Sequence, residues 1–202
     1  RRHSFPTRRS SDLHLDAWDL GQGAHDDGAG CVHALEAVRL LQACGIRPRC
    51  TIRVVLFANE ENGLRGAKTY AEAHAAELGR HVAALELDSG GGRPQAVTFA
   101  GPATARELLG RVIAPLRAIG IERVLDREAG GADLSTIEGK VPIVGLVQDT
   151  SRYFEWHHTQ ADTLDKLDRL DLNLSAAAVA VLLRGLADAP ERLPLVPHVA
   201  QR

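Results

Sequence analysis

The stretch TIRVVLFANEEN, residues 51–62, decides the fold, because an apolar run with β-branched residues ends abruptly in two adjacent glutamates. Nearly continuous apolar residues are typical of a strand that is covered on both faces. Like charges side by side repel each other, and burying either one is costly unless it is paired or binds a metal. Glu60 and Glu61 therefore suggest a site at the point where a buried strand stops.

The segments around this strand alternate between helical and strand patterns. We predict helices over 31–45, 64–79, 104–120 (interrupted by Pro115) and 171–188, with strands over 51–58, 81–88, 95–100 and 141–148. The alternation predicts an α/β fold, a three-layer α/β/α sandwich around a mostly parallel, mixed sheet. The Pro-rich residues 191–202 are predicted to be a tail.

Composition excludes several classes of protein. The chain has 202 residues, of which 45% are hydrophobic, and this length fits one domain. A net charge of −2 gives no sign of a nucleic-acid or polybasic membrane surface, and we expect no membrane span. Cys31, Cys44 and Cys50 have neither disulfide-framework nor zinc-finger spacing. The glycine-rich stretches 21–30 and 89–94 do not match phosphate-binding loops, so we predict no nucleotide site.

The first thirteen residues do not fit the rest of the chain. Residues 3–13, HSFPTRRSSDL, match the translation of a common short-read sequencing adapter. We therefore interpret residues 1–13 as a non-native segment and exclude them from the predicted fold. The catalytic domain is then expected to cover residues 14–190 and to be truncated at its N-terminus. Because missing strands would expose a sheet edge, we expect the 202-residue chain to be poorly soluble or inactive.

Acidic and histidine side chains follow the predicted strands. Glu60 and Glu61 follow the first, Asp88 ends the second, and His157 and His158 lie in the loop after the last. The aspartates Asp26 and Asp27 lie in the loop before the first helix. In such sheets the ligand site lies at the carboxyl ends of the strands, so we expect these groups to converge.

This set of residue types predicts a metal site. His, Asp and Glu are zinc ligands, and converging carboxylates would repel one another unless cations neutralised them. Two divalent ions, with one bridging carboxylate and a base for the attacking water, would satisfy the set. Each residue also has an ordinary interpretation: the aspartates of 26–27 can cap a helix, Asp88 can end a turn, and the histidines can lie in a polar loop.

Six motifs, taken in order, resemble the co-catalytic zinc exopeptidases of family M28, and within it the branch that contains carboxypeptidase Q. They are HLDAWD (14–19), HDDGAG (25–30), FANEENGLRGA (57–67), ELDSGG (86–91), GGAD (130–133) and HHTQADT (157–163). The resemblance covers residues 14 to about 188. It implies two Zn²⁺ per chain and a short peptide as substrate.

The resemblance also implies a role for each site residue. His14 and Asp88 would bind one zinc, Glu61 and His158 the other, and Asp26 would bridge them, with Glu60 as general base. Asp16 would accept a hydrogen bond from His14, and the peptide after Asp26 would be cis. His157 would lie outside the ligand set, as a supporting or substrate-side residue. Asp133 either orients a site residue or ends a turn.

Two other functions stay open at this point. A single-zinc glutaminyl-cyclase-like acyltransferase uses the same fold, and some relatives of these peptidases are non-catalytic interaction domains. The resemblance implies a secreted or periplasmic protein, although no signal segment is seen in this chain. The sequence leaves open the choice between amino-, carboxy- and dipeptidase activity, as well as the oligomeric state.

Overall fold

The computed structural model describes residues 8–128 and 131–196, with side chains described from residue 13 onward. A single six-stranded sheet, in the order β2-β1-β3-β6-β4-β5, runs through this part of the chain. Its strands are β1 (Arg8–His14), β2 (Thr51–Phe57), β3 (His81–Glu86), β4 (Pro94–Thr98), β5 (Val124–Leu125) and β6 (Ile143–Gln148). β4 pairs with β6 in the antiparallel sense, and the other neighbours are parallel. The predicted mostly parallel, mixed sheet is confirmed.

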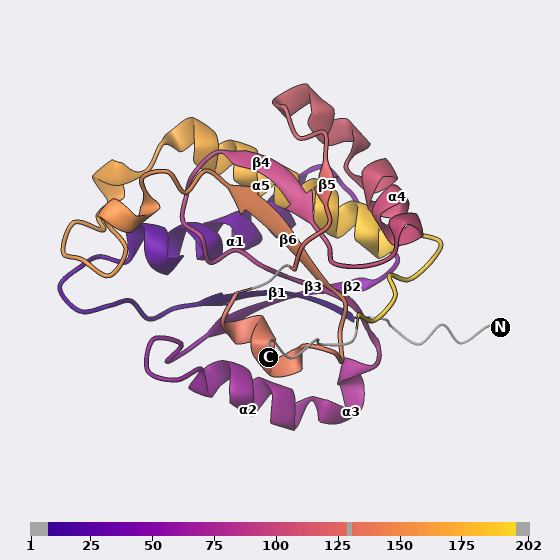
Figure 1. The fold of residues 1–202 in the computed structure, drawn as a ribbon, viewed down its shortest axis with the longest axis horizontal. Coiled ribbons are helices and arrows are strands. Elements are labelled where there is room, and N and C mark those ends of the chain that lie inside the picture. Colours follow the sequence, from indigo (N-terminus) through magenta and orange to yellow (C-terminus); the bar gives the residue numbers. More distant parts are fainter. Residues whose placement is uncertain (1–7, 129–130, 197–202) are drawn as a thin grey trace.

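Helices cover both faces of this sheet (Figure 1). On one face lie α1 (Ala29–Ala43), α4 (Ala103–Val112) and α5 (Arg169–Asp188). On the other lie α2 (Arg65–Ala73), α3 (Ala75–Leu78) and the short turn η3 (Asp133–Ile137). Shorter helical turns are η1 (Ala24–Gly28), η2 (Ala114–Ile119), η4 (Tyr153–Glu155) and η5 (Leu164–Lys166). The predicted three-layer α/β/α sandwich is therefore confirmed.

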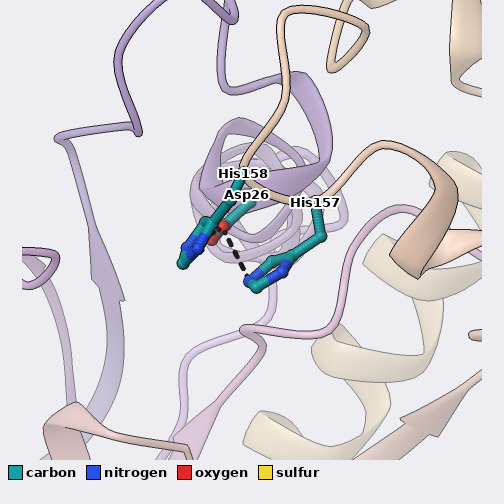
Figure 2. A group of neighbouring side chains, drawn as sticks. All are labelled: Asp26, His157 and His158. Atoms are coloured by element: carbon teal, nitrogen blue, oxygen red, sulfur yellow. Dashed lines mark ion pairs between the residues drawn. The ribbon is translucent and has the colours of Figure 1, made fainter.

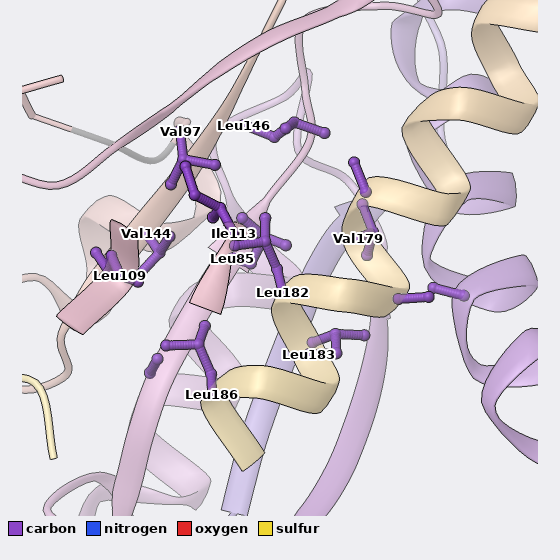
Figure 3. Packing of buried hydrophobic residues seen from close by; sticks show 14 of the residues in the cluster. Leu85, Val97, Leu109, Ile113, Val144, Leu146, Val179, Leu182, Leu183 and Leu186 are labelled. Carbon is purple, nitrogen blue, oxygen red and sulfur yellow. The ribbon is translucent and has the colours of Figure 1, made fainter. Parts of the chain in front are cut away.

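Each face of the sheet has its own apolar core. β3 is buried along its whole length, and its alternating side chains serve both faces. Leu85 packs into the larger core beneath α1, α4 and α5, together with Leu109, Val144 and Leu182 (Figure 3). Ala84 packs into the smaller core on the α2 side. This double burial explains why β3 lacks an exposed polar face.

The strand β1 crosses the predicted boundary after residue 13. Residues Arg8–His14 form one strand, which pairs with β2 from Arg8↔Thr51 to His14↔Phe57 and also pairs with β3. Parallel pairing uses backbone N–H and C=O groups, so a polar sequence can occupy a strand that a hydrophobic pattern would not mark. The origin of these residues as a non-native segment stays a prediction, and residues 1–7 lie outside the described part.

One helix prediction needs correction, and another is confirmed. The segment predicted as one helix over 64–79 is divided into α2 and α3 at His74, whose φ is −107°, and whose ring packs on Tyr70 and pairs with Glu77 at 3.4 Å. The predicted interruption at Pro115 is confirmed, because α4 ends at Val112 and η2 follows.

The helix α5 is long and apolar enough to cross a membrane by length and composition alone. Half of its most apolar stretch is buried inside the fold, where it packs against α1 and the sheet. Its N-terminus is capped by Asp168, whose carboxylate accepts hydrogen bonds from the N–H groups of Leu170 and Asp171. These contacts are those of a core helix.

Candidate metal centre

The carboxyl ends of three neighbouring strands bring the predicted residues together. His14 is the last residue of β1, Glu60 follows the end of β2 by three residues, and Asp88 follows the end of β3 by two. The loop after β6 carries His157 and His158, whose rings both reach Asp26. The turn η1 adds Asp26 just before α1. The expected convergence at this edge is thus present in the structure.

Asp26 lies at the centre of the group. Its Oδ1 atom is 3.2 Å from Nε2 of His14, and its Oδ2 atom is 3.2 Å from Nε2 of His158. The side chain is only 5% exposed, so both oxygens are directed at these partners rather than at bulk water. One carboxylate therefore faces two separate groups of atoms that could bind a metal, one through each oxygen; these groups are called donor sets below.

His14 and Asp88 form the first donor set with Oδ1 of Asp26. Nε2 of His14 is 3.6 Å from Oδ1 of Asp88. Nδ1 of His14 lies 2.9 Å from the carbonyl oxygen of Asp16, which accepts its proton in a hydrogen bond. Nδ1 therefore carries the proton of the neutral ring, and Nε2 is the nitrogen that can bind a metal. The hydrogen bond expected between His14 and Asp16 is thus made by the backbone of Asp16, since its carboxylate is 4.0 Å away.

Glu61 and His158 form the second donor set with Oδ2 of Asp26. Oε2 of Glu61 is 3.0 Å from Nε2 of His158, and the Glu61 side chain is 5% exposed. The indole of Trp18 stacks on the His158 ring at 4.6 Å with an interplanar angle of 15°. This stack restricts the imidazole to the orientation that meets Glu61 and Asp26.

The two adjacent histidines point to the same side, as Figure 2 shows. His158 has a φ of 59°, and this left-handed backbone turns its ring toward that of His157 instead of away from it. The rings stack at 3.7 Å, and Nε2 of His157 lies 3.3 Å from Oδ2 of Asp26. His157 thus contacts the central carboxylate, whereas His158 contacts both that carboxylate and Glu61.

Glu60 is held beside the donor sets by its backbone. The carboxylate of Asp16 accepts hydrogen bonds from the N–H groups of Glu60 (3.0 Å) and Glu61 (3.3 Å). Partial burial raises the pKa of the Glu60 carboxyl, and the charges of Asp88 and Glu61 raise it further against the opposing effect of His14. A carboxylate with a raised pKa is better suited to accept and return a proton.

The centre has the electrostatics of a cation site. Burial lowers the pKa of His14, but hydrogen bonds that its ring donates to the carboxylates of Asp26 and Asp88, together with the charge of Asp27, outweigh that effect and raise the pKa to about 12. Among the described residues, buried atoms without an aligned hydrogen bond include Nε2 of His14, Oδ2 of Asp26 and Oε1 of Glu61. Converging donor atoms of this kind fit divalent ions of the zinc type.

Asp27 is almost completely buried next to this group. Its Oδ2 atom accepts the backbone N–H of His14 at 3.3 Å, and burial raises the pKa of its carboxyl. The Asp26–Asp27 peptide bond is cis, as the resemblance implied, so that prediction is confirmed.

Asp133 and Glu86 form a second acidic pair beside the centre. The Glu86 carboxylate accepts N–H groups of Gly131, Asp133 and Leu134 at 2.8–3.2 Å, so it holds the start of η3 against the end of β3. Burial and the charge of Glu86 raise the pKa of Asp133 to about 8. Among the described residues, neither carboxylate oxygen of Asp133 has a hydrogen-bond partner. Sequence reasoning missed Glu86, although it lies inside the ELDSGG motif.

The remaining histidines lie outside the two donor sets. His25, His33 and His81 are buried and His74 is half-exposed, while His198 lies outside the described residues. Nδ1 of His25 accepts the N–H of Gly91, and its ring stacks on Trp156 at 4.7 Å. These contacts give His25 a structural role in the fold.

Comparison with known proteins adds to this geometry. Residues 13–183 match the profile described as "Peptidase family M28". Carboxypeptidase Q from Rattus norvegicus is 38% identical over 182 residues, which cover 90% of this chain and 38% of that protein. The chain therefore spans about two fifths of the length of the curated relatives it matches.

Two solved structures have the same fold. The peptidase M28 precursor from Shewanella amazonensis SB2B is 37% identical, with a TM-score of 0.89, and the match covers 95% of this chain and 44% of that one. The zinc aminopeptidase BSAP from Bacillus subtilis is 18% identical, with a TM-score of 0.72, and the match covers 93% of this chain and 48% of that one. The second likeness concerns the fold alone.

Proposed function

Because this chain belongs to peptidase family M28, we propose that it is the catalytic region of a two-zinc exopeptidase that hydrolyses short peptides. The observation that carries the proposal is the bridging position of Asp26, whose two oxygens face His14 and His158 at 3.2 Å each. A carboxylate shared in this way is what a pair of divalent ions requires.

We assign His14, Asp88 and Oδ1 of Asp26 to one ion, and Glu61, His158 and Oδ2 of Asp26 to the other. The donor set of imidazole and carboxylate suits zinc, and a zinc aminopeptidase shares the fold. His157 is assigned to the substrate side of the site. When bound, the two ions lower the pKa of a water molecule and polarise the scissile carbonyl.

The chain's own residues supply the proton transfers. Glu60 accepts the proton of the attacking water and delivers it to the amine that leaves. Its raised pKa favours the first step, because a carboxylate with a higher pKa is a stronger base. The two hydrogen bonds to Asp16 hold the Glu60–Glu61 backbone in place while the proton moves. Asp16 also holds the proton on Nδ1 of His14 through its carbonyl oxygen.

Two alternatives are less well supported. A single-zinc cyclase would not need a second complete donor set, yet His14, Asp88 and Asp26 form one beside Glu61 and His158. A non-catalytic interaction domain would not need five ligand-type residues that converge with a base beside them.

The resemblance to carboxypeptidase Q also favours a secreted or periplasmic location for the whole protein.

The test is peptide hydrolysis by the zinc-loaded chain and its Glu60→Gln variant. Glu60→Gln should keep the bound zinc and lose at least about 100-fold in kcat, because general acid–base catalysis contributes about that much or more. Glu72→Gln, an exposed glutamate on α2, is the matched control and should behave like the wild type. Unchanged hydrolysis in folded, zinc-loaded Glu60→Gln would refute the assignment of the base.

The same assay separates the competing reactions. Dipeptides with a blocked N-terminus or a blocked C-terminus distinguish a carboxypeptidase from an aminopeptidase. Release of ammonia from an N-terminal glutamine peptide, without a cleaved product, would indicate the cyclase instead.

A further inference from the structure

Asp162 is a buried carboxylate that lies outside both donor sets. It is 3% exposed and belongs to the loop between His158 and η5. Its Oδ1 atom accepts the backbone N–H of His25 at 2.6 Å, and its Oδ2 atom accepts the backbone N–H of Asp26 at 3.0 Å. One side chain therefore binds the two consecutive peptide groups that lead into the bridging carboxylate.

The segment that Asp162 holds cannot satisfy these N–H groups by itself. Asp26 and Asp27 have non-helical backbone angles, with φ of −121° and −129°, so η1 does not continue as a regular helix through them. A buried backbone N–H without a partner is costly, and here the partner comes from a different loop. Asp162 thus determines where this turn of the backbone lies.

The two loops are joined at further points. The N–H of Gln22 donates to the carbonyl oxygen of Asp162 at 2.9 Å, and the N–H of Leu164 donates to the side-chain oxygen of Gln22 at 3.2 Å. His158 and Asp162 lie four residues apart on one of these loops. A single loop therefore supplies both a predicted ligand and the group that fixes the bridging residue.

We propose that Asp162 is the positioning residue that sets the bridging carboxylate between the two ions. The proposal rests on the two-zinc function above. Because Asp26 faces one donor set with each oxygen, loss of its backbone anchor should weaken both ions together. Loss of a ligand that belongs to one ion, such as Glu61, should weaken that ion first. This difference separates a positioning role from that of an ordinary ligand.

The test uses zinc titration of the metal-free chain against a chromophoric chelator. Asp162→Asn replaces one acceptor oxygen with an NH₂ group that faces a backbone donor, so both apparent zinc Kd values should rise by about 10- to 100-fold, in parallel. Asp165→Asn is the matched control, since Asp165 is an exposed aspartate of the adjacent turn η5 that faces Thr163 and Lys166. Glu61→Gln is the reference for the loss of one ion.

Three outcomes would overturn the proposal. Two zinc ions bound by Asp162→Asn with wild-type Kd values would show that the anchor does not position the bridge, while the two-zinc function would stand. Loss of one ion alone would show that Asp162 supports the binding of that ion only and does not position the bridging carboxylate. If neither Asp162→Asn nor Asp162→Ser folds without metal, as judged by circular dichroism, Asp162 is a folding residue and not a positioning one. A folded wild type that binds no zinc would instead refute the proposed function.

Discussion

His33 makes the stability of the metal-free chain depend on pH. It lies on the buried face of α1, is 0% exposed, and neither ring nitrogen has a hydrogen-bond partner among the described residues. Burial alone lowers its pKa from 6.5 to about 4. A charged imidazole here would lack both water and a counter-ion, so the folded chain keeps it neutral.

The magnitude follows from this lowered pKa. Between pH 6.5 and pH 4 the unfolded chain binds a proton at His33 that the folded chain does not bind. The folded state therefore loses stability as the pH falls through this window, and the contribution is fully present above pH 6.5. A shift of this size corresponds to roughly 3 kcal/mol, at about 1.4 kcal/mol per pH unit.

The perturbation is His33→Leu, measured by urea unfolding with chelator present at pH 7 and pH 4. At pH 7 the variant should be more stable by about 1–3 kcal/mol, because a buried polar group without partners is removed. At pH 4 the advantage should grow by roughly 3 kcal/mol. His74→Leu, which removes a half-exposed histidine, is the control. An advantage that is the same at both pH values would refute the reasoning.

Three further predictions test the site and its surroundings. Gly30→Ala places a Cβ within 2.3–2.5 Å of two buried oxygens and should lower the free energy of unfolding by about 1–3 kcal/mol. Gly110→Ala, where the added Cβ has nothing within 4 Å, should raise the free energy of unfolding by about 0.5–1 kcal/mol. Urea unfolding measures both changes. Glu61→Gln should bind about one zinc instead of two by elemental analysis, and retention of two would contradict its place in the ligand set. Asp16→Asn should lower kcat by roughly 10- to 100-fold, because the backbone of Glu60 loses an anchor, and an unchanged kcat in a peptide assay would contradict that role.

Much of this architecture could be predicted because its signals are local. The apolar run predicted β2, and the helical spacing of apolar residues predicted α1 and α5; each element lies within a few residues of its predicted bounds. The rule that sites lie at the carboxyl ends of parallel strands then places Glu60, Asp88 and His158 at one edge, and the structure brings them there.

The strand β1 could not be predicted from hydrophobic pattern. Central strands of a covered sheet normally read as apolar runs, and residues 8–12, RRSSD, do not. The strand is formed by backbone pairing with β2 and β3, which is independent of side-chain type. Periodicity carries no information about such pairing.

The groups that support the site were missed for a related reason. Asp162 and Glu86 accept hydrogen bonds from backbone N–H groups of segments 136 and 45–48 residues away in the chain. No residue pattern records which distant peptide group a carboxylate will meet. The quoted motifs contain both residues, so their positions were visible in the sequence, but their partners were not.

In the proposed site, two zinc ions share the Asp26 carboxylate. The most direct measurement is elemental analysis of zinc in the folded chain, with Asp26→Ala and the control Asp19→Ala beside it. We expect about two zinc ions per chain in the wild type and in Asp19→Ala, and less than one in Asp26→Ala, because both ions lose a ligand. A folded wild type without zinc, or a folded Asp26→Ala variant that still holds two ions, would contradict it.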